Sequence, residues 1–137
     1  MPTITLFHGT TKKIAETIIK EGLKANSYLT SREDVAEYYA EVAMEDAVDK
    51  GDADADCVIL SVIVKQNDLR VDYCAYEEPL TYYRNDFTKC DSEWHEGVNN
   101  GDIPYPKDIK DTAVALSVTG CVKTQSLVTS KYITIYE

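Results

Sequence analysis

The chain of 137 residues is long enough to bury a hydrophobic core, and its 44% hydrophobic and 28% charged residues indicate one globular domain spanning residues 1–137. No apolar run reaches the ~20 residues that a membrane span needs, and MPTITLF lacks the features of a signal peptide. The four cysteines, Cys57, Cys74, Cys90 and Cys121, form no CxxC pair, so we expect free thiols in a cytoplasmic protein and no metal site.

The first elements expected are a strand, a helix and a second short strand. Thr3–Phe7 alternates β-branched and apolar residues, which predicts a strand. Apolar residues four positions apart predict a helix over Lys12–Glu21, with Gly22 as its stop. His8–Thr11 (HGTT) lies between these two elements, and Ser27–Thr30 is expected to form the second strand.

A second helix is expected directly after this strand, in TSREDVAEYYAEVAMEDAVDKG. Two overlapping capping-box patterns mark its start, Thr30 with Glu33 and Ser31 with Asp34. Its helical spacing predicts a stripe that faces the core. The stripe consists of Val35, Tyr39, Val42 and Ala43.

The negative charge is concentrated in this part of the chain. The segment Glu33–Asp56 holds ten acidic residues and one basic residue, which gives −9 of the total charge of −10. This charge disfavours nucleic acid as a partner, because phosphate contacts need a basic face. Two interpretations stay open: a solvated helix face that aids solubility, or a surface that docks a basic partner.

The rest of the chain predicts a central strand, a long loop, a helix and two final strands. Cys57–Val64 is continuously apolar and is expected to be a strand buried on both faces. The irregular, aromatic stretch Tyr73–Pro106 is expected to be a functional loop. A third helix is expected over Lys107–Val118, followed by strands in CVKT (121–124) and KYITIY (131–136). This order indicates an α+β or mixed α/β domain, with a sheet flanked by two or three helices.

Four short motifs occur in the order HGT, EGL, YLT and AEYYA within residues 4–42. In this order they resemble the ADP-ribosyltransferase fold, in the branch of the poly-ADP-ribose polymerases, diphtheria-type toxins and RNA 2′-phosphotransferases. A looser likeness links TSKYITIY (129–136) to the last strand of the polymerases. The resemblance implies a split mixed sheet and NAD as co-substrate.

The resemblance also implies roles for residues around the nicotinamide end of NAD. His8 would hydrogen-bond a ribose hydroxyl, and the backbone N–H and C=O of Gly9 would pair with the nicotinamide amide, a close approach that glycine permits. Tyr28 and Tyr39 would sandwich the nicotinamide ring by stacking. Thr10 would line the pocket or cap the first helix.

Two positions stay open. Tyr38 is adjacent to Tyr39 and is its rival for the second ring, although Tyr39 shares the inward side of the helix. The polymerases carry a glutamate before the Tyr-Ile-Val-Tyr strand, and here Lys131 stands in its place, which puts polymer-forming chemistry in doubt. Gln125 would supply a neutral hydrogen bond instead. An acid from the long loop, Asp72, Glu93 or Glu96, would be a further alternative that folds over the site.

The expected function is NAD-dependent transfer of a single ADP-ribose to a protein or other macromolecule, with release of nicotinamide, as in a toxin or a phage or host-conflict effector. One alternative is a non-enzymatic binding protein that uses the acidic segment Glu33–Asp56. Another is NAD hydrolysis or RNA 2′-phosphotransferase-like chemistry in the same pocket.

Overall fold

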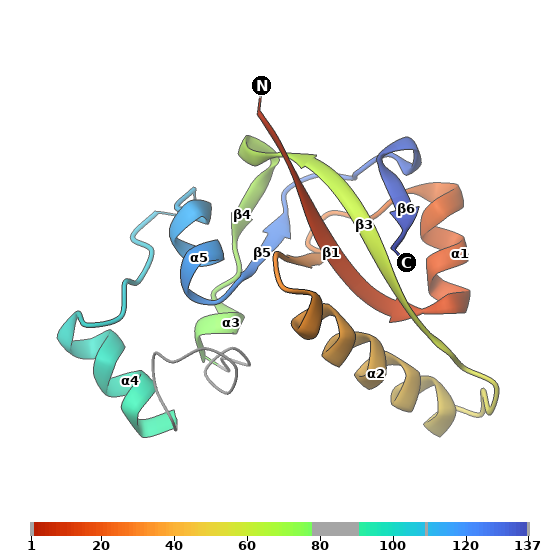
Figure 1. Cartoon of the computed structure of the whole chain (residues 1–137), viewed down its shortest axis with the longest axis horizontal. Helices are drawn as coiled ribbons and strands as arrows, with labels where there is room; N and C mark the ends of the chain where they lie inside the picture. The colour runs from red at the N-terminus through yellow and green to blue at the C-terminus, as the bar shows by residue number, and fades with distance from the viewer. Residues whose placement is uncertain (1, 78–90, 109, 137) are drawn as a thin grey trace.

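The fold is an α+β arrangement with a single six-stranded sheet, seen in a computed structural model that describes residues 2–77, 91–108 and 110–136 (Figure 1). The strands are β1 (Thr3–Thr11), β2 (Tyr28–Thr30), β3 (Cys57–Lys65), β4 (Leu69–Val71), β5 (Cys121–Thr124) and β6 (Ile133–Ile135). The helices are α1 (Lys12–Glu21), α2 (Glu33–Asp49), α3 (Cys74–Glu77), α4 (Asp91–Asn100) and α5 (Thr112–Val118). None of these described helices is long and apolar enough to cross a membrane.

The sheet has the order β4-β5-β2-β1-β3-β6, and every pair of neighbouring strands in it is antiparallel. The α+β class is therefore confirmed, whereas the expected mixed sheet is wrong. Pairing is uneven across the sheet. β1 pairs with β3 along its whole length, but it pairs with β2 only at Phe7 and Thr30. β1 and β2, at the centre of the sheet, are thus joined by a single residue pair.

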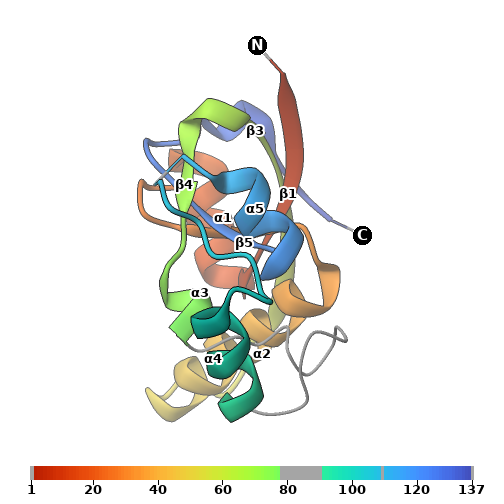
Figure 2. The same ribbon diagram turned by 90° about the vertical axis from the view of Figure 1, so that its left-hand side faces the viewer.

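α1 and α2 pack against opposite faces of the sheet. Leu6 and Leu60 point to the same side as Ala15 of α1 and form the main core with it. Because side chains alternate along a strand, Gly9 faces the opposite side, where it packs against Ala36 of α2. α3, α4 and α5 gather around the β4 end instead (Figures 1 and 2).

The burial of β3 and α2 differs from the sequence expectation. β3 is buried on one face through Leu60, Val62 and Val64, while Ile63 is 43% exposed, so the expectation of burial on both faces is wrong. In α2 the fully buried residues are Val35, Ala36 and Ala40, and Val42 is 43% exposed. The expected stripe is displaced because α2 lies so close to Gly9 that only small side chains fit between them.

The start of α2 is also different. Its N-cap is Arg32, whose side chain makes no capping hydrogen bond, and Asp34 accepts from the N–H of Val35 beside it, so neither expected capping box forms. The hydroxyl of Thr30 instead accepts a hydrogen bond from the backbone N–H of Arg32. Thr30 is fully buried on β2.

Part of the expected loop Tyr73–Pro106 is helical. α4 is anchored by Trp94, which is fully buried and donates its indole N–H to the carbonyl of Tyr76 at 2.9 Å. Residues 78–90 of that stretch, with Cys90, lie outside the described residues. α5 begins at Thr112 rather than Lys107. The remaining three cysteines carry free thiols, as expected.

Candidate functional site

The separation of β1 from β2 exposes backbone groups that side chains then satisfy. Continuing the register past Phe7 and Thr30 would set Gly9 opposite Tyr28, but no backbone pair forms there. Instead the hydroxyl of Tyr28 accepts a hydrogen bond from the N–H of Gly9 at 2.7 Å and donates one to its C=O at 2.8 Å. The imidazole Nδ1 of His8 lies 2.8 Å from the carbonyl oxygen of Tyr28. The side chains of Tyr28 and His8 thus make hydrogen bonds to backbone groups that β1 and β2 would otherwise pair with each other.

The hydrogen bond of His8 fixes its tautomer. A carbonyl oxygen only accepts, so Nδ1 must carry the proton that it donates to Tyr28. Burial lowers the pKa of His8, and the hydrogen bond to the Tyr28 carbonyl, which raises it, does not compensate. The ring is therefore neutral at pH 7, with Nε2 as an acceptor. A hydroxyl donor, such as that of a ribose, is the natural partner for Nε2.

Gly9 is fixed by its contact with α2. A Cβ at this position would collide with the backbone carbonyl of Ala36 and lie 2.9 Å from the backbone nitrogen of Ala40. Only glycine permits this approach. The N–H and C=O of Gly9 therefore stand together at the open edge of β1, as one donor beside one acceptor.

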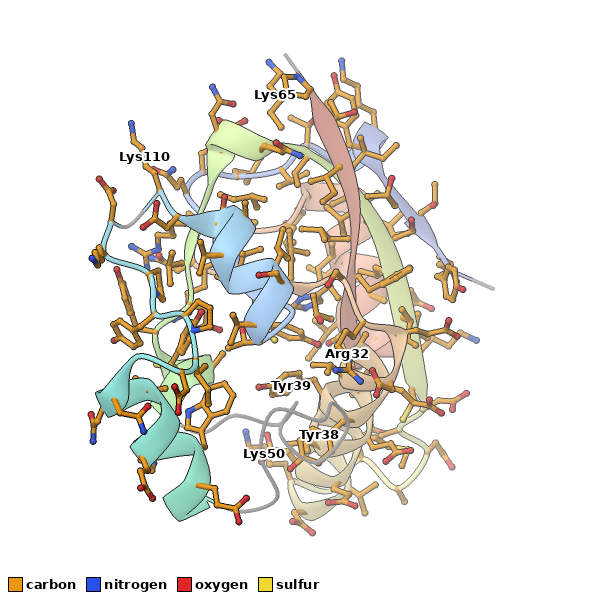
Figure 3. The ribbon with its side chains drawn as sticks, turned by 60° about the vertical axis from the view of Figure 1, so that its left-hand side comes forward. Arg32, Tyr38, Tyr39, Lys50, Lys65 and Lys110 are labelled. Carbon is orange, nitrogen blue, oxygen red and sulfur yellow. The ribbon has the colours of Figure 1, made fainter. Side chains whose placement is uncertain are left out.

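Aromatic rings surround this edge. The ring centroids of Tyr28 and Tyr39 are 4.4 Å apart, and those of His8 and Tyr28 are 4.6 Å apart. Tyr38 contacts Tyr39 edge-on at 5.6 Å and is 37% exposed (Figure 3). Tyr39 rather than Tyr38 is thus the ring of α2 that meets Tyr28.

The two tyrosines are in contact with each other. A ring stacked between them would need a separation of about 7 Å, since each aromatic contact takes about 3.5 Å. Entry of a nicotinamide ring therefore requires one tyrosine to move. Burial raises the pKa of the Tyr28 hydroxyl, which keeps it protonated and able to donate to Gly9.

Three other predicted residues, Thr10, Gln125 and Lys131, take no part in these contacts. Thr10 is buried in β1, and it is Thr11 whose hydroxyl caps α1 by accepting from Ile14, so the capping role expected for Thr10 is wrong. The side-chain amide of Gln125 is engaged by the carbonyls of Asn67 and Leu69.

Lys131 does not lie on the last strand. It stands in a 3-10 turn, Ser130–Tyr132, and β6 begins only at Ile133. β6 pairs with β3, so β3 separates it from β1 and from His8. The expectation that KYITIY forms one strand carrying Lys131 is therefore wrong. On the side of β2 that faces away from β1, the neighbouring strand is β5.

β5 brings residues to the site that the sequence interpretation missed. Lys123 is the register partner of Tyr28 on one side and of Arg70 on the other. Cys121 is the partner of Thr30, and its buried thiol has a pKa raised to about 12, chiefly by burial. The alternation in CVKT predicts a strand, but no local signal states which strand it pairs with.

The three acids considered in the sequence have different surroundings. Asp72 is 7% exposed at the end of β4, where its carboxylate accepts from the N–H of Cys74 and lies 3.9 Å from the Nζ of Lys123. Glu93 and Glu96 are exposed on α4. Among the residues described, no group of three or more His, Cys, Asp or Glu is placed to hold a metal ion.

A separate groove of about 380 Å³ lies between α2, β3 and the end of the chain. Its walls are Glu33, Glu37, Ala40, Cys57, Val58, Ile59, Ile135 and Tyr136. The hydroxyl of Tyr136 donates to the carboxylate of Glu33 at 3.0 Å, which ties the end of the chain to α2.

Comparisons of the chain with protein-family models, with curated proteins and with solved structures found no match. The site therefore has to be interpreted from its own geometry.

Proposed function

We propose that the protein is an NAD-dependent ADP-ribosyltransferase that transfers a single ADP-ribose to a macromolecular acceptor and releases nicotinamide. The observation that carries this proposal is the meeting of His8, Gly9, Tyr28 and Tyr39 at the separation of β1 and β2. They come from three elements and are the four residues to which the resemblance in sequence assigns the nicotinamide end of NAD.

The backbone of Gly9 supports this proposal further. A primary carboxamide donates through its NH₂ group and accepts through its C=O group, so it fits the paired C=O and N–H of one residue. The hydroxyl of Tyr28 now satisfies both groups of Gly9. In the proposed complex the carboxamide of nicotinamide takes these two hydrogen bonds, and the Tyr28 ring moves to stack on the nicotinamide.

The reaction breaks one bond and forms one. The bond between the nicotinamide nitrogen and the ribose carbon breaks, and its electron pair leaves with nicotinamide. A nucleophile of the acceptor binds the same ribose carbon and gives its proton to solvent. His8 would accept a hydrogen bond from a ribose hydroxyl through Nε2.

The test is incubation with NAD labelled in its adenylate half, together with a cell lysate. The proposal predicts free nicotinamide and labelled macromolecules, both lost in His8→Ala and both retained in the control His95→Ala, since His95 is exposed on α4. Nicotinamide without labelled acceptor would indicate hydrolysis in the same pocket. Absence of both products from the wild-type protein would contradict the proposal.

A second candidate function is docking of a basic protein partner without catalysis. The groove beside α2 supports it, because Glu33 and Glu37 stand on its wall next to the apolar side chains of Ile59 and Ile135. A partner segment with a basic residue beside an apolar one would match this wall in charge and polarity. Glu37→Lys should abolish such binding, and under this second hypothesis the wild-type protein releases no nicotinamide from NAD.

A further inference from the structure

Two cationic side chains stand next to the proposed nicotinamide site, on neighbouring strands. Arg70 of β4 is the register partner of Lys123 of β5, and Lys123 is the register partner of Tyr28 of β2 (Figure 1). Register partners in an antiparallel sheet project to the same face, so these three side chains form one row. In this row Lys123 lies between Tyr28 and Arg70.

This pairing is unfavourable in the free protein. Like charges directly opposite each other in an antiparallel pair are destabilising. The Nε of Arg70 is buried and has no hydrogen-bond partner among the described residues. The Nζ of Lys123 lies 3.9 Å from the carboxylate of Asp72. A buried donor without a partner costs stability, so a ligand that supplies acceptors would relieve both costs.

The chemistry of the pair selects the ligand. A guanidinium group offers several N–H donors to the oxygens of a phosphate, and an ammonium adds a point charge. With Asp72 included, the three side chains carry a net charge of +1, in a chain whose total charge is −10. A cationic spot on such a chain is the place where an anion can bind.

We propose that Arg70 and Lys123 form a phosphate-binding subsite beside Tyr28. The source of the phosphate rests on the proposed function: it is either the diphosphate of NAD or a phosphate group on the acceptor. The binding of phosphate to the pair does not itself require transfer activity.

The test uses inorganic pyrophosphate and the variant Arg70→Met, which keeps an unbranched stem and removes the charge. Lys110→Met is the matched control, because it removes one positive charge from an exposed lysine far from Tyr39 (Figure 3). Titration calorimetry should show pyrophosphate binding to the wild-type protein and to Lys110→Met, and about tenfold weaker binding to Arg70→Met. Equal affinity of all three proteins, or no binding to the wild type, would overturn the proposal.

Thermal unfolding without ligand provides a second reading. Removing one of two facing cations should raise the Tm of Arg70→Met by about 1–4 °C, whereas Lys110→Met should not change it. A lower Tm for Arg70→Met would show that Arg70 stabilises the fold, and would overturn the argument that the pair is unfavourable without a ligand.

Competition with ADP-ribose identifies the source. If ADP-ribose displaces pyrophosphate, and Arg70→Met weakens both, the subsite holds the diphosphate of NAD. If both bind together, it holds an acceptor phosphate. Both results support the subsite. A protein that binds pyrophosphate through Arg70 but releases no nicotinamide from NAD would keep this inference and remove the proposed transfer.

Discussion

Burial makes the imidazole of His8 a neutral group whose charge state couples to folding. Its pKa is lowered from 6.5, mainly by burial, so the unfolded chain binds a proton at a higher pH than the folded protein does. The contribution of neutral His8 to the free energy of unfolding is therefore fully present above the pKa that His8 has in the unfolded chain. It is lost as the pH falls from 6.5 toward the lowered pKa of the folded protein, by up to about 1.4 kcal/mol per pH unit.

The variant His8→Gln tests this linkage, because it removes the titrating group. Urea unfolding between pH 7.5 and about pH 5 should show a smaller loss of stability for His8→Gln than for the wild-type protein. His95→Gln is the control and should follow the wild type, since His95 is exposed. A His8→Gln profile parallel to that of the wild type would contradict a buried neutral imidazole.

The hydroxyl of Tyr28 has two consequences that Tyr28→Phe separates. Its removal leaves the N–H of Gly9 without a partner, which should lower the free energy of unfolding by about 1–3 kcal/mol. It also frees both groups of Gly9 for a carboxamide, so nicotinamide should raise the Tm of Tyr28→Phe more than that of the wild type.

Differential scanning fluorimetry with and without nicotinamide measures both effects of Tyr28→Phe. Tyr38→Phe is the control, because Tyr38 lies on the exposed side of Tyr39. An equal rise in Tm for Tyr28→Phe and the wild type would contradict the view that the hydroxyl occupies the carboxamide position.

At the scale of elements, the contact between β1 and α2 depends on Gly9. Gly9→Ala would force a Cβ into the backbone of Ala36, so α2 has to shift, at a cost of about 3 kcal/mol. Gly51→Ala is the control. Nothing lies within 4 Å of the Cβ added at Gly51, and its positive φ alone should cost about 1 kcal/mol. Chemical denaturation compares the two variants, and equal costs would contradict the close packing of α2.

The acidic face of α2 should act on the thiol of Cys57. Burial raises the pKa of this thiol, and Glu41 is the largest of the charged causes. Glu41→Lys replaces repulsion of the thiolate by attraction, so the pKa of Cys57 should fall. Alkylation of Cys57 by iodoacetamide, followed by mass spectrometry from pH 7 to about pH 9.5, measures the change. Glu16→Lys on α1 should leave it unaltered, and an unaltered pKa in Glu41→Lys would contradict the account.

Elements with local signals could be predicted, and elements held by distant contacts could not. α1 and its stop at Gly22 follow from apolar spacing and from a glycine with φ 93°. α4 has no such signal, because its anchor is the burial of Trp94 against Tyr76, which belongs to another element. The hidden face of α2 depends on Gly9, which is more than twenty residues away from it.

The candidate site likewise contains residues that could be predicted from the sequence and residues that could not. His8, Gly9, Tyr28 and Tyr39 lie within one stretch of the chain, and the resemblance carried by the motifs of that stretch predicts that they meet. Lys123 and Arg70 reach Tyr28 only through the register of β4, β5 and β2. Register between strands far apart in the sequence is set by the whole sheet, so no local signal in CVKT or LRV predicts this row.

At the scale of the molecule, an acidic helix and a pair of cations lie on different elements of the fold. The acidic helix α2 lies along β1 and β3, while the cations Arg70 and Lys123 lie on β4 and β5. The proposed nicotinamide site stands between these regions, at the single rung that joins β1 to β2. We therefore propose that a basic macromolecule docks on α2 and that phosphate binds to Arg70 and Lys123.

The most direct test of the nicotinamide site compares the binding of nicotinamide and nicotinic acid by titration calorimetry. Both molecules have the same ring, but the carboxylate of nicotinic acid has no N–H to donate to the C=O of Gly9. We expect nicotinamide to bind and nicotinic acid to bind at least about tenfold more weakly. Equal affinities, or no binding of nicotinamide at all, would contradict a carboxamide site at Gly9.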